Sequence, residues 1–412
     1  MARIKKRVKR SISIVLILAI LLIGGIAVKN VFFSKEDNPV KNFIKEKVKK
    51  EDPIKVYKAK LIATGDGLIH SPIYQAARTT DGYDFSHMLT YTKDLLKDYD
   101  IKYYNQETVF DDSRPVQSYP RFNTPSAFGR DMIGAGFNLV SLASNHSMDM
   151  GGDSGVRSAT WWESQEGILA TGMASSEEKR NEHKIMDANG ITYTMLSYTY
   201  GTNGMPIPQD KPWVVNVFNE EQAKLDIEAV RDKVDILIVA MHWGQEYMQT
   251  ATEVQRNQAK FLAENGVDIV LGNHSHSLQP WERINDTIVF YSFGNFISNQ
   301  MGAQEARVRK VGVIGGFGTL DITKTHDTRD DTKTIKIDNI GFEFNYTYKH
   351  NNNGKTDYTV IPFSKMEDRF LNYYYQGQTL QAVYDEFSSV LKAYDDSIII
   401  KPLQIKEPIN EN

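Results

Sequence analysis

Four short apolar runs in this sequence each end in a group of polar side chains, and this repetition restricts the possible folds more than any other feature. The runs alternate with segments of helical spacing between Val56 and about Leu320. This alternation indicates βαβ units and a mixed or parallel sheet, in which the carboxyl ends of parallel strands meet in one crevice. The runs with their polar ends are Lys60–Asp66 followed by His70, Phe137–His146, Asp235–His242 and Asp268–His276.

Histidine is concentrated at the ends of these predicted strands. The chain has nine histidines, and five of them occupy such positions. A single histidine after an apolar run is more often a core or surface residue, but five in the same position indicate a shared site. A shorter run, Tyr103 to Glu107, ends in a carboxylate. The five histidines are His70, His146, His242, His274 and His276.

These residue types predict a metal site. Imidazole together with Asp, Glu and an Asn carbonyl suits Mn, Zn or Fe better than Ca or Mg. Cysteine is absent, which excludes thiolate ligands, disulfides and a cysteine-linked lipid anchor. His274 and His276 are separated by one residue and can face different ions, while Glu107 can bridge them. Water held between two divalent ions becomes hydroxide near neutral pH, so the predicted chemistry is hydrolysis.

The first 33 residues predict a membrane anchor. Residues 1–10 contain six basic residues and no acid, and form a predicted cytoplasmic tail. Residues 11–33 are almost entirely apolar and predict one transmembrane helix with its N-terminus in the cytoplasm. A cleaved signal peptide is the alternative, but Ala27-Val28-Lys29 is a poor cleavage site. The expected location is therefore the cell membrane, as a single-pass protein with its main domain extracellular.

Three further segments follow the predicted helix. Residues 34–56 are rich in Lys and Glu and predict a charged stalk, residues 57–325 the main domain, and residues 326–412 an extension with a β-hairpin and a helix. Of the 48 basic residues, seven precede position 34, which leaves 41 against 52 acidic residues and a net charge of −11. Such an acidic domain is a poor partner for nucleic acid.

Six motifs, in order along the chain, resemble the capsule-synthesis CapA family, which includes the PgsA-type component of poly-γ-glutamate synthesis. The resemblance covers roughly residues 57 to 320. The motifs are T-G-D at Asp66, N-Q-E at Asn105–Glu107, S-N-H-S-M-D-M-G at Ser144–Gly151, H-W-G-Q-E-Y at His242–Tyr247, G-N-H-S-H-S-L-Q-P at Gly272–Pro280 and Y-S-F-G-N-F at Tyr291–Phe296.

This resemblance implies a metallophosphatase-like fold, an α/β four-layer αββα sandwich with mixed sheets, and a dinuclear metal site. Asp66 and His276 would bind one ion, Asn145, His242 and His274 the other, and Glu107 would bridge them. His146 would be the general acid or the charge stabiliser on the leaving group. His70 is also a candidate ligand, although it lies four residues after Asp66 where the wider superfamily has Asp-x-His.

Other motif residues are expected around these ligands. Glu246 and Tyr247 either orient the ring of His242 or form a strand-end ion pair, with neither option favoured. Asp149 is expected in a turn that holds Asn145 and His146, and Asn295 beneath the site. Asn105 is also expected next to the ligands. The loop Tyr198–Gly204 is either a cleft wall or, slightly favoured, a plain surface loop.

Three functions are compatible with these features. The first is a metal-dependent component of poly-γ-glutamate synthesis or export, working with other membrane subunits of a polymer synthase on an anionic polymer. The second is an extracytoplasmic phosphoesterase that acts on a nucleotide or a cell-wall phosphate. The third is a non-catalytic assembly subunit. A fold and a set of ligands cannot choose a substrate by themselves.

Overall fold

The computed structural model describes residues 53–404. The predicted cytoplasmic tail, the predicted transmembrane helix and nearly all of the predicted stalk lie outside this range. None of the helices within residues 53–404 has the length and apolar character needed to cross a membrane. Residues 56–325 and 333–404 form one compact unit, which holds every site residue discussed below. In the smaller unit, the backbone N–H of Thr328 donates to the carbonyl of Pro53 at 2.8 Å.

The first sheet has nine strands and combines parallel and antiparallel pairs. Its order is β14-β13-β12-β1-β2-β3-β4, with β11 beside β1 and β15 beside β13. The strands β1 to β4 are parallel to their neighbours in this series. The strands are β1 (Ile54–Gly67), β2 (Ile101–Gln106), β3 (Leu139–Ser141), β4 (Leu169–Thr171), β11 (Asn295–Ile297), β12 (Ile314–Asp327), β13 (Thr332–Asn352), β14 (Lys355–Pro362) and β15 (Ile399–Ile400).

The second sheet has six strands in the order β5-β6-β7-β8-β10-β9. Its central pairs β6–β7, β7–β8 and β8–β10 are parallel, and both outer pairs are antiparallel. Both sheets are therefore mixed, as the alternating sequence pattern predicts. The strands are β5 (Met186–Ala188), β6 (Ile191–Thr199), β7 (Ile236–His242), β8 (Ile269–Asn273), β9 (Trp281–Ile284) and β10 (Thr287–Phe290).

The side chains of β7 alternate between two apolar clusters, which shows how the sheets are layered. Ile236, Ile238 and Ala240 belong to the cluster that also contains the core of the first sheet. The intervening Leu237, Val239 and Met241 belong to a second cluster with helical residues. Because successive side chains on a strand point to opposite faces, one face of the second sheet packs on the first sheet and the other on helices.

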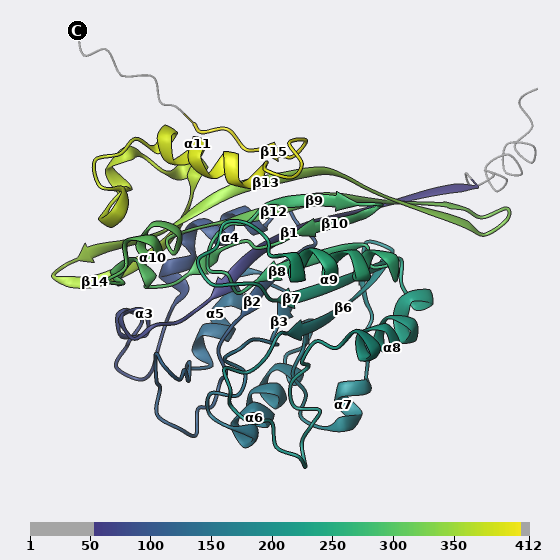
Figure 1. Ribbon diagram of the computed structural model, residues 1–412, viewed down its shortest axis with the longest axis horizontal. Helices are drawn as coiled ribbons and strands as arrows, with labels where there is room; N and C mark the ends of the chain where they lie inside the picture. Colours follow the sequence, from purple (N-terminus) through teal and green to yellow (C-terminus); the bar gives the residue numbers. More distant parts are fainter. Residues whose placement is uncertain (1–52, 405–412) are drawn as a thin grey trace, which may run out of the picture. The chain divides into compact units, whose positions relative to one another are not determined.

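Helices cover the outer faces of the two sheets (Figure 1). On β2, Tyr103 reaches the second sheet, where its hydroxyl accepts from Asn273, whereas the ring of Tyr104 contacts the helical residues Phe128 and Trp162. The second sheet is covered by α8 and α9, whose Ile227 and Leu262 lie in the second apolar cluster. These helices are α5 (Ala127–Ala135), α6 (Gly152–Glu163), α8 (Glu220–Val230) and α9 (Glu253–Glu264).

The remaining helices are shorter or lie toward the end of the chain. They are α3 (Ser71–Ala76), α4 (Thr90–Leu96), α7 (Glu177–Asn181), α10 (Ala306–Val311) and α11 (Leu380–Leu391). Single 3₁₀ turns occur at Ser86–Leu89, Arg231–Lys233, Gln300–Gly302, Phe363–Lys365, Asp368–Phe370 and Tyr373–Tyr375.

The predicted C-terminal hairpin and helix are present, and they extend the first sheet. Strands β13 and β14 pair antiparallel around the turn that follows Asn352. The helix α11 packs its Phe387 against Phe344 of β13, with ring centroids 6.4 Å apart. At the other end, β1 begins at Ile54, inside the segment predicted as stalk.

Two glycines allow strands to approach one another unusually closely next to the polar strand ends. A Cβ atom on Gly65 would lie 1.8 Å from the carbonyl oxygen of Gly294, and one on Gly272 would lie 2.0 Å from that of Tyr291. Real Cβ atoms do not come so close to backbone. Glycine is therefore required just before Asp66 and just before Asn273.

Candidate metal centre

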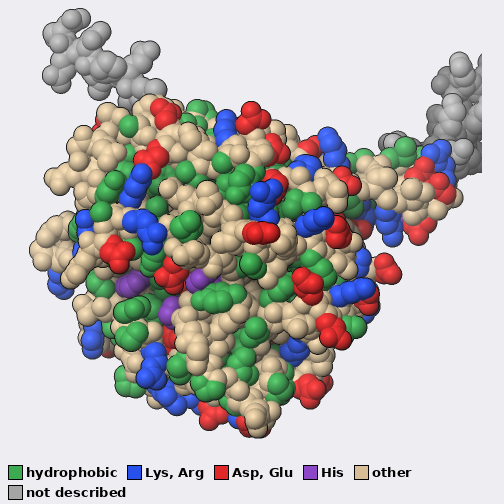
Figure 2. Space-filling view, in the orientation of Figure 1, with side chains coloured by type: hydrophobic (Ala, Val, Ile, Leu, Met, Phe, Trp, Pro, Cys, Tyr) green, Lys and Arg blue, Asp and Glu red, His purple; other side chains and the backbone are tan. Residues whose placement is uncertain are grey.

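The polar residues predicted to form a site do meet at one end of the two sheets. Glu107 directly follows β2, Asn145 and His146 lie in the loop after β3, and His242 is the last residue of β7. Asp66 lies near the end of β1, and His274 and His276 follow β8. Since neighbouring strands in both series are parallel, their carboxyl ends deliver these groups to a common place. Figure 2 shows histidine side chains gathered on one face of the protein.

Five of these residues form two buried clusters that share one carboxylate. Glu107, His242 and His274 have ligand atoms within 4.8 Å of one another, and so do Asp66, Glu107 and His276. The Oε1 atom of Glu107 lies 3.5 Å from Nε2 of His276 and 3.8 Å from Nε2 of His242. Asn145 joins the first cluster, because its Oδ1 atom lies 2.9 Å from Nε2 of His242.

Unpartnered polar atoms show that these clusters suit a metal. Both carboxylate oxygens of Glu107 and the Nδ1 atom of His274 are buried without a hydrogen-bond partner. A buried carboxylate without partners is costly, and such a group is normally paired or bound to metal. Carboxylate oxygens and imidazole nitrogens together form a donor set for first-row divalent ions. The residues present therefore fit a divalent metal at each cluster.

Burial and mutual repulsion favour neutral imidazole in the first cluster. Burial lowers the pKa of His242 and of His274 well below the usual value, and neighbouring imidazoles lower both further. Neutral imidazole is the form that binds metal. Burial raises the pKa of Glu107 well above its usual value, although His276 opposes this shift. For His276, burial lowers the pKa, but the carboxylates of Glu107 and Asp66 outweigh it and raise the pKa to about 10.

Asn105 contacts one residue of each cluster and so links the two. Its amide nitrogen donates to Oδ1 of Asp66 at 2.8 Å and lies 3.3 Å from Nδ1 of His242. One side chain of β2 thus contacts one predicted ligand in each cluster. A residue that holds the second nitrogen of a ligating imidazole fixes the orientation of the ring.

His146 lies beside the clusters and is oriented by a carboxylate. Its Nδ1 atom is 2.7 Å from Oδ2 of Asp149, which also accepts from the backbone N–H of Phe122 at 2.7 Å. The ring of Phe122 packs edge-on against the imidazole at 4.8 Å. With Nδ1 engaged, Nε2 is the nitrogen left for proton transfer.

The turn that carries His274 and His276 has an unusual backbone. His274 has a φ of 93° and His276 a φ of 53°, both in the left-handed region that non-glycine residues rarely adopt. Such residues cost about 1–3 kcal/mol each and cluster at functional sites. Hydrogen bonds from Ser275 Oγ to the carbonyl of Ser277 and from Ser277 Oγ to that of Met248 hold this turn.

The other predicted residues occupy varied positions around the clusters. His70 belongs to neither cluster, and its Nδ1 atom accepts from the backbone N–H of Asn299 at 3.2 Å. Burial and the positive charge of His276 lower its pKa to about 4. Asn295 Oδ1 lies 3.1 Å from Nδ1 of His276. The ring of Tyr247 lies 5.9 Å from that of His276, not beside His242, and Glu246 is partly exposed next to it.

Two residues of the loop after β6 contact the clusters, although the sequence pattern slightly favours a plain surface loop there. The ring of Tyr200 lies 4.7 Å from that of His274 and is 48% exposed. Asn203 accepts a hydrogen bond at 3.3 Å from the amide of Asn145. The glycines of Tyr198–Gly204 were the available signal, but nothing in the sequence shows which residues of this loop face the site.

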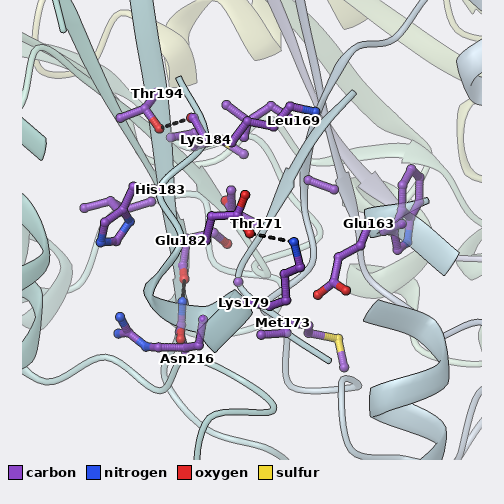
Figure 3. A pocket seen from close by; sticks show the side chains of 18 of the residues that line it. Glu163, Leu169, Thr171, Met173, Lys179, Glu182, His183, Lys184, Thr194 and Asn216 are labelled. Carbon is purple, nitrogen blue, oxygen red and sulfur yellow. Dashed lines mark hydrogen bonds and ion pairs between the residues drawn. The ribbon is translucent and has the colours of Figure 1, made fainter. Parts of the chain in front are cut away.

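A separate pocket of about 270 Å³ lies between β4, β6 and α7 and contains none of the clustered residues. Two ion pairs involve charged side chains of its lining. Arg180 forms two hydrogen bonds with Asp226, at 2.7 and 2.6 Å, and Lys179 pairs with Glu182 (Figure 3). Glu163 accepts from Ser175, and Lys184 donates to the carbonyl of Ile168 at 2.8 Å.

Comparison with known proteins places this site in a family context. The chain is 32% identical over 167 residues to the PGA biosynthesis protein CapA of Bacillus subtilis, which covers 40% of this chain and 43% of that protein. It is 24% identical over 226 residues to the capsule biosynthesis protein CapA of Bacillus anthracis, over 53% of this chain and 54% of that protein. The chain thus matches about half the length of these relatives.

Among solved structures, the sulfate thiohydrolase SoxB of Thermus thermophilus aligns with 82% of this chain and 61% of its own, with 11% identity and a TM-score of 0.39. That likeness is too weak to carry an argument about function.

Residues 60–300, more than half of the chain, match the family described as bacterial capsule synthesis protein PGA_cap. All five clustered residues and Asn145 lie within this range, and the chain belongs to the bacterial capsule synthesis protein family.

Proposed function

We propose that this chain is a metal-dependent hydrolase that acts outside the membrane in the synthesis or export of a poly-γ-glutamate capsule. The observation that carries the proposal is Glu107, whose two buried carboxylate oxygens lack hydrogen-bond partners and which is shared by both clusters. A carboxylate in this position suits a bridge between two divalent ions. We therefore assign Asp66 and His276 to one ion and Asn145, His242 and His274 to the other.

The chain's own groups around these ions suit hydrolysis. Two divalent ions, when bound, would supply a hydroxide nucleophile near neutral pH and neutralise charge on the bond that breaks. Asn105 holds the ring of His242 and the carboxylate of Asp66 in place. His146, oriented by Asp149, transfers a proton from Nε2 to the leaving group. Tyr200 forms an exposed wall beside His274.

The substrate part of the proposal rests on the family and on the expected topology. The name of the Bacillus subtilis relative refers to PGA biosynthesis, and both relatives share the name CapA. An anchored domain outside the membrane would meet the polymer, or its carrier, together with other membrane subunits of the synthase. ATP-dependent ligation would remain cytoplasmic. Protease added to intact protoplasts should degrade the domain, and full protection would contradict this topology.

A phosphoesterase is the second candidate, since the same paired clusters suit a phosphate ester. Full-length protein purified in detergent and loaded with Mn²⁺ or Zn²⁺ should distinguish the two. Oligo-γ-glutamate and a nucleotide are supplied as substrates, and the products are separated chromatographically. Cleavage of the oligomer supports the polymer hydrolase, whereas cleavage of the nucleotide alone supports the phosphoesterase. His274→Ala is the control that shows whether either activity belongs to this site.

Genetic complementation tests the role in the cell. Deletion of the gene should abolish or alter surface-released poly-γ-glutamate, measured as yield and chain length. Glu107→Gln and His146→Ala proteins should reach the membrane without restoring the polymer. Full rescue by both variants would eliminate catalysis and leave an assembly subunit. An unchanged polymer in the deletion strain would instead remove the capsule role.

A further inference from the structure

The side of the metal centre next to His276 carries an exposed cation, Arg307 of α10. The ring of Tyr247 lies 5.9 Å from the imidazole of His276, and the guanidinium carbon of Arg307 lies 6.0 Å from the centre of the same tyrosine ring. Tyr247 is therefore an aromatic platform between the predicted ligand and the cation. A guanidinium at this distance over a tyrosine ring is within the range of a cation–π contact.

Tyr247 is held firmly in this place. Its backbone N–H donates to the carbonyl of Ser275, within the turn that carries both histidines, at 2.6 Å. Its hydroxyl accepts from the side chain of Gln300 at 3.2 Å, and the Oε1 atom of Gln300 accepts from Asn295 at 2.7 Å. Asn295 in turn contacts His276. A continuous set of contacts thus connects the metal centre to the segment that leads into α10.

Arg307 differs from the other cations of its helix. Lys310 pairs with Glu386 at 2.5 Å, and Arg309 donates to the carbonyl oxygens of Ala303 and Gln304. Within residues 53–404, no carboxylate forms an ion pair with Arg307, and its side chain is exposed. A planar guanidinium without a partner is well suited to grip a carboxylate with two parallel hydrogen bonds.

The acidic surroundings of the clusters make a cation at position 307 important for binding an anionic substrate. The groups near the metal centre are acidic, with Glu107, Asp66 and Glu246 all contributing negative charge at His276. The sequence outside the first 33 residues also carries a net charge of −11. An anionic chain would be repelled from such a surface except where a cation or a metal intervenes. Arg307 is such a cation, because it contacts the same tyrosine ring, Tyr247, that lies beside His276 of the second cluster.

We propose that Arg307 binds a carboxylate of the substrate chain, one that projects from a residue beside the bond at the metal centre. This inference rests on the proposed function, and it specifies a substrate with a repeating negative charge. A substrate whose only charge lies at the reacting bond would not reach across Tyr247. Arg307, supported by the ring of Tyr247, binds the carboxylate, while the reacting bond lies next to the two clusters.

The test compares Arg307→Ala and Arg307→Lys with a matched control, Arg369→Ala. Arg369 is also an exposed arginine over an aromatic ring, 4.9 Å from the centre of Phe370, and it pairs with Glu367. Binding of oligo-γ-glutamate to metal-loaded full-length protein is measured by calorimetry at two salt concentrations. Hydrolysis is followed in parallel to separate KM from kcat, and an uncharged methyl-ester oligomer serves as the second ligand.

Arg307→Ala should weaken binding of the charged oligomer roughly 10- to 100-fold, which is the usual effect of removing a charged hydrogen bond. The loss should appear in KM rather than kcat, should be absent for the methyl ester, and should be partly restored in Arg307→Lys. Equal affinity in Arg307→Ala and wild type, an equal loss in Arg369→Ala, or no binding by wild type would overturn the inference. Binding through Arg307 without cleavage would instead remove the proposed hydrolysis and leave the inference standing.

Discussion

The Nε2 atom of His242 lies 2.9 Å from the Oδ1 atom of Asn145, although the two residues are 97 positions apart and follow strands of different sheets. His242 ends a strand of the second sheet, and Asn145 follows a strand of the first. The candidate metal centre is therefore built across the junction of the two sheets, and its geometry depends on how they pack.

Replacing Glu107 with Gln should affect both metal positions, because this residue is common to both clusters. We expect the metal content of the dialysed protein, measured by elemental analysis, to fall at both positions. His274→Ala should affect one position only. The loss of affinity should exceed the 10- to 100-fold typical of residues that merely support a ligand. The exposed Glu228 on α8 provides a control, as Glu228→Gln should bind metal like wild type. Unchanged metal content in folded Glu107→Gln would refute the assignment.

His146→Gln should reduce kcat by about 10²- to 10⁴-fold while metal content stays at the wild-type level. The reason is that His146 lies outside both clusters and is positioned by Asp149. Asp149→Asn should give a smaller loss, since the imidazole remains but its orientation is less fixed. If His146→Gln lost metal as well, His146 would be a ligand rather than a proton donor.

Asn203→Ala should weaken metal binding at the cluster of His242 by about 10- to 100-fold without unfolding the protein. Asn203 accepts from the amide of Asn145, and this bond keeps the carbonyl oxygen of Asn145 directed at His242. The measurement is a metal titration followed by calorimetry. Tyr200→Phe tests the same network from the other side, because it removes the hydroxyl that donates to Asn203 at 3.3 Å and keeps the ring against His274. Equal metal affinity in Asn203→Ala and wild type would show that the loop does not support the ligand.

Asp226→Asn should destabilise the protein by about 3 kcal/mol at pH 7, because it leaves Arg180 without its buried partner. Burial alone would raise the pKa of Asp226, but hydrogen bonds from Arg180 and Tyr198 outweigh it and lower the pKa below its usual value. A carboxyl with a lowered pKa stabilises the fold above its unfolded pKa of about 3.9, and this contribution disappears as the pH falls through the folded value.

The destabilisation by Asp226→Asn should accordingly be constant between pH 7 and pH 5 and shrink below about pH 4. Denaturant unfolding over this range measures it. Asp210→Asn is the control, because Asp210 pairs with Lys211 on the surface and is largely exposed. That substitution should leave the stability close to that of wild type, because exposed ion pairs contribute little. A pH-independent difference for Asp226→Asn would contradict the ionic origin of the effect.

The sequence predicts the strand ends well because each ligand follows an apolar run that must be buried. Asp66, Glu107, His242 and His274 all lie where parallel strands end, so their proximity follows from the topology. The hairpin that turns at Asn353 and the helix Leu380–Leu391 are also visible as local patterns. These features depend on periodicity along one segment, which a sequence contains in full.

Contacts between distant loops are not visible in this way. The sequence does not show that Asn203 meets Asn145, because the path of the loop after β6 depends on packing. It leaves open whether Tyr247 orients the ring of His242, whereas the structure, with a left-handed backbone at Tyr247, brings its ring within 5.9 Å of that of His276. The predicted membrane helix lies outside residues 53–404 and stays a prediction.

The close approach of backbone at Gly65 and Gly272 has a consequence for genetics. Neither residue offers a side chain to metal or substrate, yet any Cβ atom there would force neighbouring strands apart beside Asp66 and His274. Random mutagenesis scored by loss of capsule should therefore return substitutions at these two glycines alongside those of the histidines and carboxylates. A map of inactivating mutations would therefore contain backbone positions that support the candidate centre as well as the residues that form it.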